Sequence, residues 1–405
     1  MKLLPFHYAA RNIGRSPLRL LLTAGGGAIV VFLVVSAVAS VRALDRGVRA
    51  SGTAGNVMLL GAGSEESVER SEITASTPGI LAASIPNIRT IGGAQFVSPE
   101  LHVPLPLRRS GDVAPAGSAR DLVLVRGIEP AAFLVHPQAR LSIGRLPEQG
   151  RDEAIIGRSV AARLAITDAD VAAEAQAESG AGGEAPTLLI DDIRYTITGI
   201  IDAPGVSIDG EVWVPISDLL VRTKRQTISV TVVSLASGDA SDLEVFAARR
   251  PDLELAAIDE PSYYAQLAQF FRPVQVMIGF SALIVALGAM LGGLNALDAA
   301  FASRSREIAM LQVLGFSRTA VITSLVQESL ITIAAGALPA LFLAALVLDG
   351  AGVRFSMGIF SLSVDATCVA SGLAAALLLG LLGSLPPAIR CMRASIPSAL
   401  KSDLV

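Results

Sequence analysis

The sequence has few of the residues on which many enzyme classes depend. Only two of its 405 residues are cysteines, and only Lys2, Lys224 and Lys401 are lysines. Two cysteines cannot build a disulfide scaffold. None of the lysines follows a glycine, as the phosphate-binding loop G-x-x-x-x-G-K-[ST] requires. We therefore expect no cofactor site and no ATP-binding motif in this sequence.

Other catalytic patterns are also missing from the sequence. It contains no H-E-x-x-H, no C-x-x-C and no G-x-S-x-G. Its three histidines, His7, His102 and His136, are widely spaced, so the default interpretation is that they are solvated or lie in loops. Acidic residues of the central region would suit glycoside hydrolysis only as a pair across a cleft, and spacing selects no pair. We expect neither a catalytic residue nor a metal site.

Charge is scarce, and long apolar runs take its place. Hydrophobic residues make up 52% and charged residues 17% of the chain, and the net charge is −4, which does not favour binding to nucleic acid. Each of four runs reaches the roughly 20 residues that cross a bilayer as a helix. They are Leu20–Ala39, Val274–Leu297, Ala320–Leu348 and Ala366–Ile389. The first run exceeds the apolar core of a typical signal peptide, so we interpret it as an uncleaved signal-anchor.

The distribution of basic residues predicts the topology. Residues 1–19, 299–319 and 388–405 together hold ten basic and two acidic residues, whereas the rest of the chain holds 22 basic and 34 acidic ones. Basic segments beside membrane spans stay in the cytoplasm. The expected order is a cytoplasmic segment (1–19), a first span (20–41), an outer domain (42–272), a second span (273–298), a cytoplasmic loop (299–319), a third span (320–348), a short outer loop (349–365), a fourth span (366–389) and a cytoplasmic tail (390–405).

The large region between the first two spans mixes strand and helix signals, and we expect an α+β domain of two lobes. Strands are expected at 56–60, 122–128, 188–201, 211–214 and 227–235, helices at 69–84, 153–165, 217–222 and 241–249, and flexible loops at 108–120 and 168–186. Its two ends, 41–50 and 262–272, either continue the spans outward as a stalk or form short juxtamembrane helices.

The cytoplasmic loop is the most informative segment. Ile308, Leu311 and Leu314 recur at three-residue spacing, which predicts a short helix with one broad apolar face. Gly315 is placed to end this helix in a left-handed conformation, and Ser317 is placed to cap the next one. A basic connector lying on lipid headgroups is the alternative, but it does not explain so firmly capped a helix.

The motifs of this loop and of both chain ends resemble a known family. Arg306-Glu-Ile-Ala-Met-Leu-Gln-Val-Leu-Gly-Phe-Ser-Arg318 is similar to the R-E-I-x-x-L-x-x-[LM]-G-x-[ST]-[RK] motif of FtsX-type permeases, the membrane subunits of MacB-like (type VII) ABC transporters. Residues 10–23 and 387–400 resemble the family's entry and ending. The chain departs from MacB in having no fused ATPase domain, and the 168–183 stretch replaces a short turn.

The resemblance implies a function. The loop helix would be a coupling helix seated on a separate cytoplasmic ATPase, which would bind the ATP. Its site residues would be Arg304, Arg306, Glu307, Ile308, Leu311, Leu314 and Gly315. Movement would pass through the spans to the outer domain, for export, efflux or extraction of a substrate on the outer side. The alternative is a transmembrane sensor or activator that signals to outer partners without transport.

The same resemblance implies a location and partners. The chain would lie in the bacterial inner membrane, beside a second permease copy or a homologue, membrane lipids and a periplasmic adaptor. Gly288 and Gly292 form a G-x-x-x-G that suits a dimer seam or packing within one subunit. Glu328 is the only charge well inside a span, and we favour a structural hydrogen bond to a neighbouring helix over a direct functional role.

Overall fold

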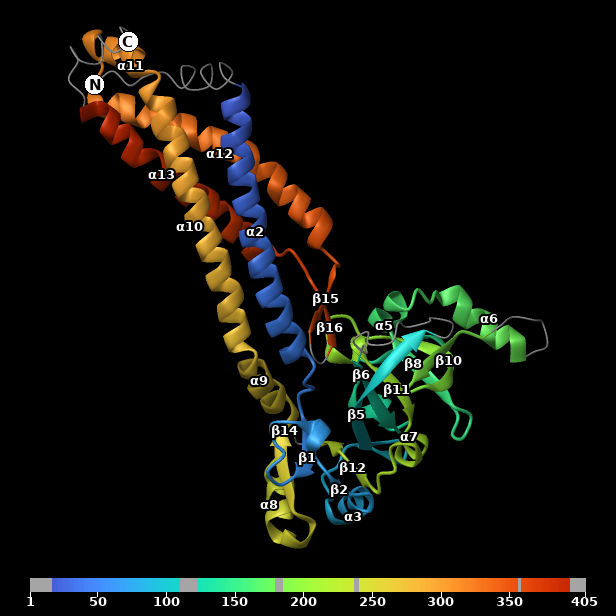
Figure 1. The fold of residues 1–405 in the computed structure, drawn as a ribbon. Helices are drawn as coiled ribbons and strands as arrows, with labels where there is room; N and C mark the ends of the chain where they lie inside the picture. The colour runs from blue at the N-terminus through green and yellow to red at the C-terminus, as the bar shows by residue number, and fades with distance from the viewer. Residues whose placement is uncertain (1–16, 110–121, 179–184, 237–239, 356–357, 394–405) are drawn as a thin grey trace. The chain divides into compact units, whose positions relative to one another are not determined.

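The computed structural model describes residues 17–109, 122–178, 185–236, 240–355 and 358–393. These residues form two compact units (Figure 1). One unit takes in 17–42, 273–351 and 362–393, and the other takes in 43–272 and 352–361. The second unit thus includes a hairpin, β15 (Gly352–Phe355) with β16 (Gly358–Ser361), inside the segment that we expected to be a short outer loop.

The first unit is built from four helices that are long and apolar enough to cross a membrane. They are α2 (Pro17–Ala50), α10 (Arg272–Ala302), α12 (Arg318–Leu348) and α13 (Ala366–Arg393). This number of spans, with an α+β domain between the first and the second, confirms the predicted fold class. α2 runs through residues 41–50 without a break, whereas 260–270 form a separate helix, α9 (Glu260–Phe270).

Three of these helices pack on one another through small residues. A side chain on Gly336 of α12 would collide with the backbone of Ala24 in α2, so glycine permits this close crossing. Gly380 of α13 likewise lies against Leu330 of α12. In α10, by contrast, the most apolar 18-residue window is not buried by any part of the chain that the structure describes. α10 therefore has an apolar surface available for a partner or for lipid.

The second unit is built on a ten-stranded sheet. Its strand order is β14-β1-β13-β5-β6-β11-β8-β10-β7, and β9 pairs with both β10 and β5. The strands are β1 (Asn56–Gly61), β5 (Val97–Arg109), β6 (Leu122–Ile128), β7 (Arg140–Gly144), β8 (Glu153–Gly157), β9 (Thr187–Ile190), β10 (Ile193–Asp202), β11 (Val212–Pro215), β13 (Val230–Ser234) and β14 (Leu255–Asp259). The long strand β5 pairs with β13 through residues 97–100 and with β6 through residues 101–106, so it joins two halves of the sheet.

Helices and short strands complete this unit. Small two-stranded pairs are formed by β2 (Ile73–Thr74) with β12 (Thr227–Ile228) and by β3 (Thr90–Ile91) with β4 (Ala94–Gln95). The α-helices are α3 (Thr77–Ser84), α4 (Ala132–Val135), α5 (Arg158–Arg163), α6 (Asp168–Glu178), α7 (Ile216–Thr223), α8 (Ser241–Arg249) and α9, and the 3-10 helices are η1 (Val68–Arg70), η2 (Ser207–Gly210) and η3 (Pro251–Leu253). The main core includes Leu59, Leu101, Ile156 and Leu188, all fully buried.

Several local predictions in this unit are wrong. Residues 69–84 are helical only in η1 and from Thr77 onward, and residues 153–157 form β8 rather than a helix. The expected strand 188–201 is a hairpin, because Asp191 and Asp192 turn the chain with φ of 48° and 65°. The stretch 168–178 is α6 rather than a loop. The expected loop 108–120 lies outside the described residues from 110 onward, and its start belongs to β5.

Candidate functional site

The predicted coupling segment forms a capped helix between the second and third spans. α11 covers Ser305–Val313. Gly315 has φ of 89°, and the N–H of Phe316 donates to the carbonyl of Leu311 at 3.2 Å, which closes the helix end. The hydroxyl of Ser317 accepts from the N–H of Ala320 at 3.2 Å and caps α12. Both caps agree with the residues chosen from the sequence.

One face of α11 attaches to three membrane helices. Ile308 is buried, and Leu311 packs partly buried against the same cluster. The cluster draws on α10, α12 and α13 through Leu297, Phe301, Val321, Leu325, Ala388 and Met392. Because this apolar contact reaches three helices, a displacement of α11 is resisted by all of them.

The opposite face of α11 is apolar and exposed. Met310, Val313 and Leu314 are exposed to 47%, 65% and 73%. The prediction that Leu314 shares a face with Ile308 is therefore wrong. A helix has 3.6 residues per turn, so side chains three residues apart point in directions that differ by about 60° around the helix axis. Two such steps carry Leu314 away from the face of Ile308. Leu314 also follows the last helical residue. Met310 and Val313, which the spacing argument missed, belong to this outward surface.

A charged pair fastens the start of α11 to the third span. Nη1 of Arg304, the residue that precedes α11, donates to Oε1 and Oε2 of Glu328 at 3.0 and 2.9 Å. Nε of Arg304 also donates to Glu307 at 3.3 Å. The side chains of Arg304 and Glu328 are only 12% and 8% exposed. The expected hydrogen bond of Glu328 thus exists, but its partner is a cation of the loop between the second and third spans rather than a residue of a neighbouring span.

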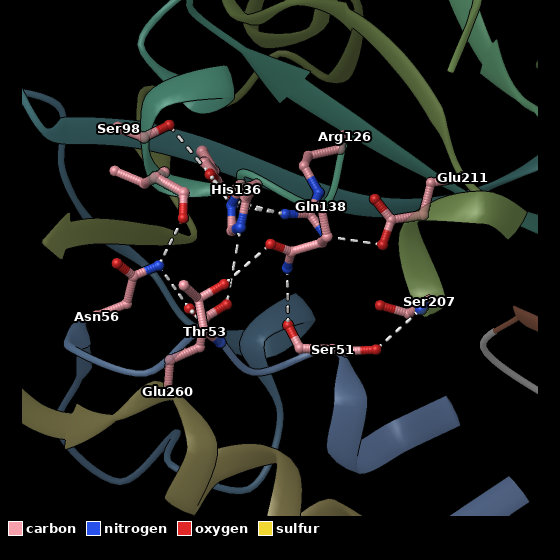
Figure 2. Close-up of polar contacts among 12 residues, drawn as sticks. Ser51, Thr53, Asn56, Ser98, Arg126, His136, Gln138, Ser207, Glu211 and Glu260 are labelled. Carbon is pink, nitrogen blue, oxygen red and sulfur yellow. Dashed lines mark hydrogen bonds and ion pairs between the residues drawn. The ribbon is translucent and has the colours of Figure 1, made fainter. Parts of the chain in front are cut away.

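The second unit holds a buried polar cluster that the sequence did not indicate (Figure 2). At its centre, the guanidinium of Arg126 donates to Glu100 at 2.9 Å and to Glu211 at 2.7 Å. His136 Nε2 donates to the other oxygen of Glu100 at 2.8 Å, and its Nδ1 lies 3.8 Å from Glu260 Oε1. Glu100 and Arg126 lie in β5 and β6, Glu211 directly precedes β11, and Glu260 opens α9.

Two further side chains complete the cluster. His102 Nε2 lies 3.0 Å from Glu100 Oε2. Trp213 Nε1 donates to Glu211 Oε2 at 2.8 Å, and the Arg126 guanidinium lies 5.4 Å from the Trp213 ring centroid. Both histidines are almost fully buried, so neither is solvated as expected. His102 lies in β5, whereas His136 does lie in a loop, directly after α4. One signal for the cluster was available, because Arg126 interrupts the apolar run of β6 and a buried cation needs partners.

The charges of the cluster compensate one another. Burial alone would raise the pKa of Glu100, but the positive charges of His136 and Arg126 hold it well below its usual range. Burial works against the charge on His136, yet Glu100 and Glu260 raise its pKa. Burial raises the pKa of Glu260, although His136 opposes the shift. Burial and Arg126 lower the pKa of His102. Closed to solvent and paired in this way, the carboxylates suit a structural connection rather than acid–base catalysis.

Two family models match the chain. The MacB-like periplasmic core domain matches residues 20–248, and the FtsX-like permease C-terminal domain matches residues 279–396. The chain belongs to the MacB/FtsX family of ABC transporter permeases. No curated protein sequence matches it.

Solved structures of two such transporters are similar to part of this permease. The periplasmic region of MacB from Actinobacillus actinomycetemcomitans is 13% identical, with a TM-score of 0.37, over 53% of the permease and 92% of that chain. The extracellular domain of the noncanonic ABC-type transporter YknZ from Gram-positive bacteria is 12% identical, with a TM-score of 0.34, over 50% of the permease and 99% of that chain.

Members of this family are multi-pass membrane permeases of ABC transporters and carry a periplasmic domain. Gly288 and Gly292 bear on how such a permease pairs. Among the described residues, no atom lies within 4 Å of a Cβ built on either glycine. Neither glycine therefore packs closely against the described residues of the same chain, and the dimer seam stays a prediction.

Proposed function

We propose that this permease couples ATP hydrolysis on a separate cytoplasmic ATPase to movement of its periplasmic domain. The movement would serve export, efflux or extraction of a substrate at the outer side of the bacterial inner membrane. The observation that carries the proposal is the two-sided construction of α11. Its inner face packs on three spans, while Met310, Val313 and Leu314 leave an apolar surface at the end of a membrane unit.

The outward surface of α11 suits a protein partner. Three neighbouring apolar side chains that remain exposed beside Arg306 form a contact patch of the kind that aromatic or aliphatic residues of a groove cover. The family supplies an ATPase as that partner. Arg306 and Glu307 flank the patch and would set its orientation through charge.

The inner face of α11 would transmit movement of the ATPase to the membrane helices. Ile308 and Leu311 pack on the apolar cluster, and the Arg304–Glu328 pair ties the first turn to α12. Close-packed interiors transmit displacement because they compress little. A movement of α11 would therefore displace α12 rather than bend the loop.

A second copy or a homologue completes the proposed assembly. The apolar surface of α10 around Gly288 and Gly292 would meet the same surface of the other copy, which lets two helices approach closely. Membrane lipids would cover the remaining apolar surface, and a periplasmic adaptor is a further partner to be sought. Both termini and α11 would lie in the cytoplasm.

Recruitment of the ATPase tests the proposal directly. The full chain, solubilised from its native membranes, is used to capture associated proteins, and captured ATP hydrolysis is measured. Val313→Glu places a charge in the apolar contact, so we expect at least a tenfold loss of captured ATPase activity. Val221→Glu, on the exposed face of α7 with 76% exposure, is the matched control and should retain it. Equal ATPase capture by V313E and wild type would refute the assignment of α11.

A further inference from the structure

The end of α2 and the start of α9 meet because of the strand pairing in the periplasmic domain. β1 begins six residues after α2 ends, and β14 ends immediately before α9 begins. β1 and β14 are antiparallel neighbours, with Val57 opposite Asp259. The segment that follows α2 and the segment that enters α9 therefore lie at the same end of these two strands.

At this end of the strands, the backbones of Gly52 and Pro261 are in contact. A Cβ built on Gly52 would lie 2.8 Å from Cα and 3.0 Å from N of Pro261. A Cβ essentially never lies within 3.0 Å of a non-bonded backbone carbon, so the position accepts only glycine without a shift of the backbone. Pro261 stands in the first turn of α9, where its fixed φ and missing N–H fit the helix start. Neither backbone can slide past the other without separating.

The carboxylate of Glu260 fastens this contact. Its Oε2 accepts from the N–H of Thr53 at 3.2 Å and from Asn56 Nδ2 at 2.7 Å, both just after α2. Figure 2 shows these bonds beside Gln138, whose amide bridges Thr53 and the carbonyl of Ser51 at 3.0 and 3.2 Å. Glu260 is 1% exposed, so water does not compete for these bonds.

The same carboxylate faces the charged cluster of the sheet. Glu260 Oε1 lies 3.8 Å from His136 Nδ1, and His136 continues to Glu100, Arg126 and Glu211. This path crosses β5 and β6 and reaches the residue directly before β11, a strand in the middle of the sheet. Asn56 adds a second route, because its Nδ2 also donates to the carbonyl of Val135 in α4 at 2.7 Å.

We propose that Gly52 and Glu260 form a joint that locks the end of α2 and the start of α9 together and to the sheet, so that both enter the periplasmic domain as one rigid body. The stalk joint, as we call Gly52, Thr53, Asn56, Glu260 and Pro261, deepens the proposed function and rests on it. α2 is the first span itself, and α9 leads through Phe271 to the second span. Glu260 is thus a positioning residue that would pass helix movement on to the sheet.

Distance measurements in the full chain test the joint. Nitroxide labels are attached to cysteines placed at Gln266 of α9 and Val221 of α7, both exposed, in a C368A/C391A background reconstituted in nanodiscs. Three forms are compared: the background, E260Q, which keeps the shape but removes the charge, and G52A, which forces the two backbones apart. Controls are E244Q on the exposed face of α8 and G79A in α3, where a Cβ meets nothing within 4 Å of the described residues.

We expect one narrow distance in the background and both controls, unchanged by nucleotide when the captured ATPase is present. E260Q and G52A should broaden the distribution at least twofold without nucleotide and make it nucleotide-dependent, while ATP hydrolysis is retained. A narrow, unchanged distribution in both variants would overturn the joint. Failure of the proposed function has a different signature, namely a background chain that captures no ATPase. In that case the joint is still tested by the width of the distance distribution in E260Q and G52A, compared with the background chain without nucleotide.

Discussion

At the scale of single residues, the Arg304–Glu328 pair is a polar contact that ties the loop between the second and third spans to α12. Both partners are largely withdrawn from solvent, at 12% and 8% exposure. Removing one partner of such a pair leaves the other charge buried and uncompensated, which costs more than the pair itself contributes. The pair is therefore better understood as a connector between α11 and α12 than as a source of stability.

Exchange of charges tests this connector. Glu328→Ala should destabilise the full chain by about 3 kcal/mol. It should also lower the coupling of ATP hydrolysis to movement, since Arg304 loses its acceptor. The double variant R304E/E328R restores opposite charges and should recover part of both losses, because the new carboxylate at 304 lies beside Glu307. Recovery is measured by thermal unfolding in detergent and by ATPase activity. Equal defects in the double variant and in E328A would contradict the connector.

We expect His136 to make the stability of the periplasmic domain depend on pH. Its pKa in the folded chain is raised above the unfolded value of about 6.5. Its contribution to stability is therefore fully present below about pH 6.5 and is lost as the pH rises through the raised value. Glu260, whose pKa is also raised, acts in the same direction. Glu100, whose pKa is lowered, loses its contribution only in acid.

Fluorescence of Trp213, the only tryptophan, follows this cluster in the full chain. We expect its thermal unfolding midpoint to fall as the pH is raised from about 6 to about 9. His136→Gln should lower the midpoint at about pH 6 and flatten its dependence on pH. An unaltered slope in H136Q would mean that other groups govern this pH range.

At the scale of elements, the caps of α11 were predictable and its faces were not. Gly315 and Ser317 act through the local backbone, so the sequence identifies them directly. Which side of α11 is covered depends on α10, α12 and α13, which lie elsewhere in the chain. Spacing alone placed Leu314 with Ile308 and passed over Val313, which the structure leaves exposed.

The strands show the same limit. Prolines at positions 99, 104 and 106 hide the pattern of β5, yet this strand joins the two halves of the sheet. The polar cluster depends on strand order, because Glu100, Arg126 and Glu211 meet only where β5, β6 and β11 are neighbours. Local patterns cannot supply that order.

At the scale of the whole molecule, composition was sufficient to predict the architecture. Four long apolar runs separated by one large mixed region allow little besides a four-span protein with an inserted domain. The paired, solvent-excluded carboxylates of the cluster suit a structural connection between strands, in keeping with the proposed function. Under the proposed function, α11 would receive the ATPase, and the stalk joint would pass movement to the sheet.

The most direct test of this account is the distance between nitroxide labels at Val221 in two copies of the full chain, measured in nanodiscs with the captured ATPase. The account predicts a clear shift of the distance between the nucleotide-free and the ATP- and vanadate-trapped states. V313E, which lacks the ATPase contact, should show no shift. An identical distance in both states of the unmodified complex, with ATP hydrolysis intact, would contradict the claim that the permease transmits movement to its periplasmic domain.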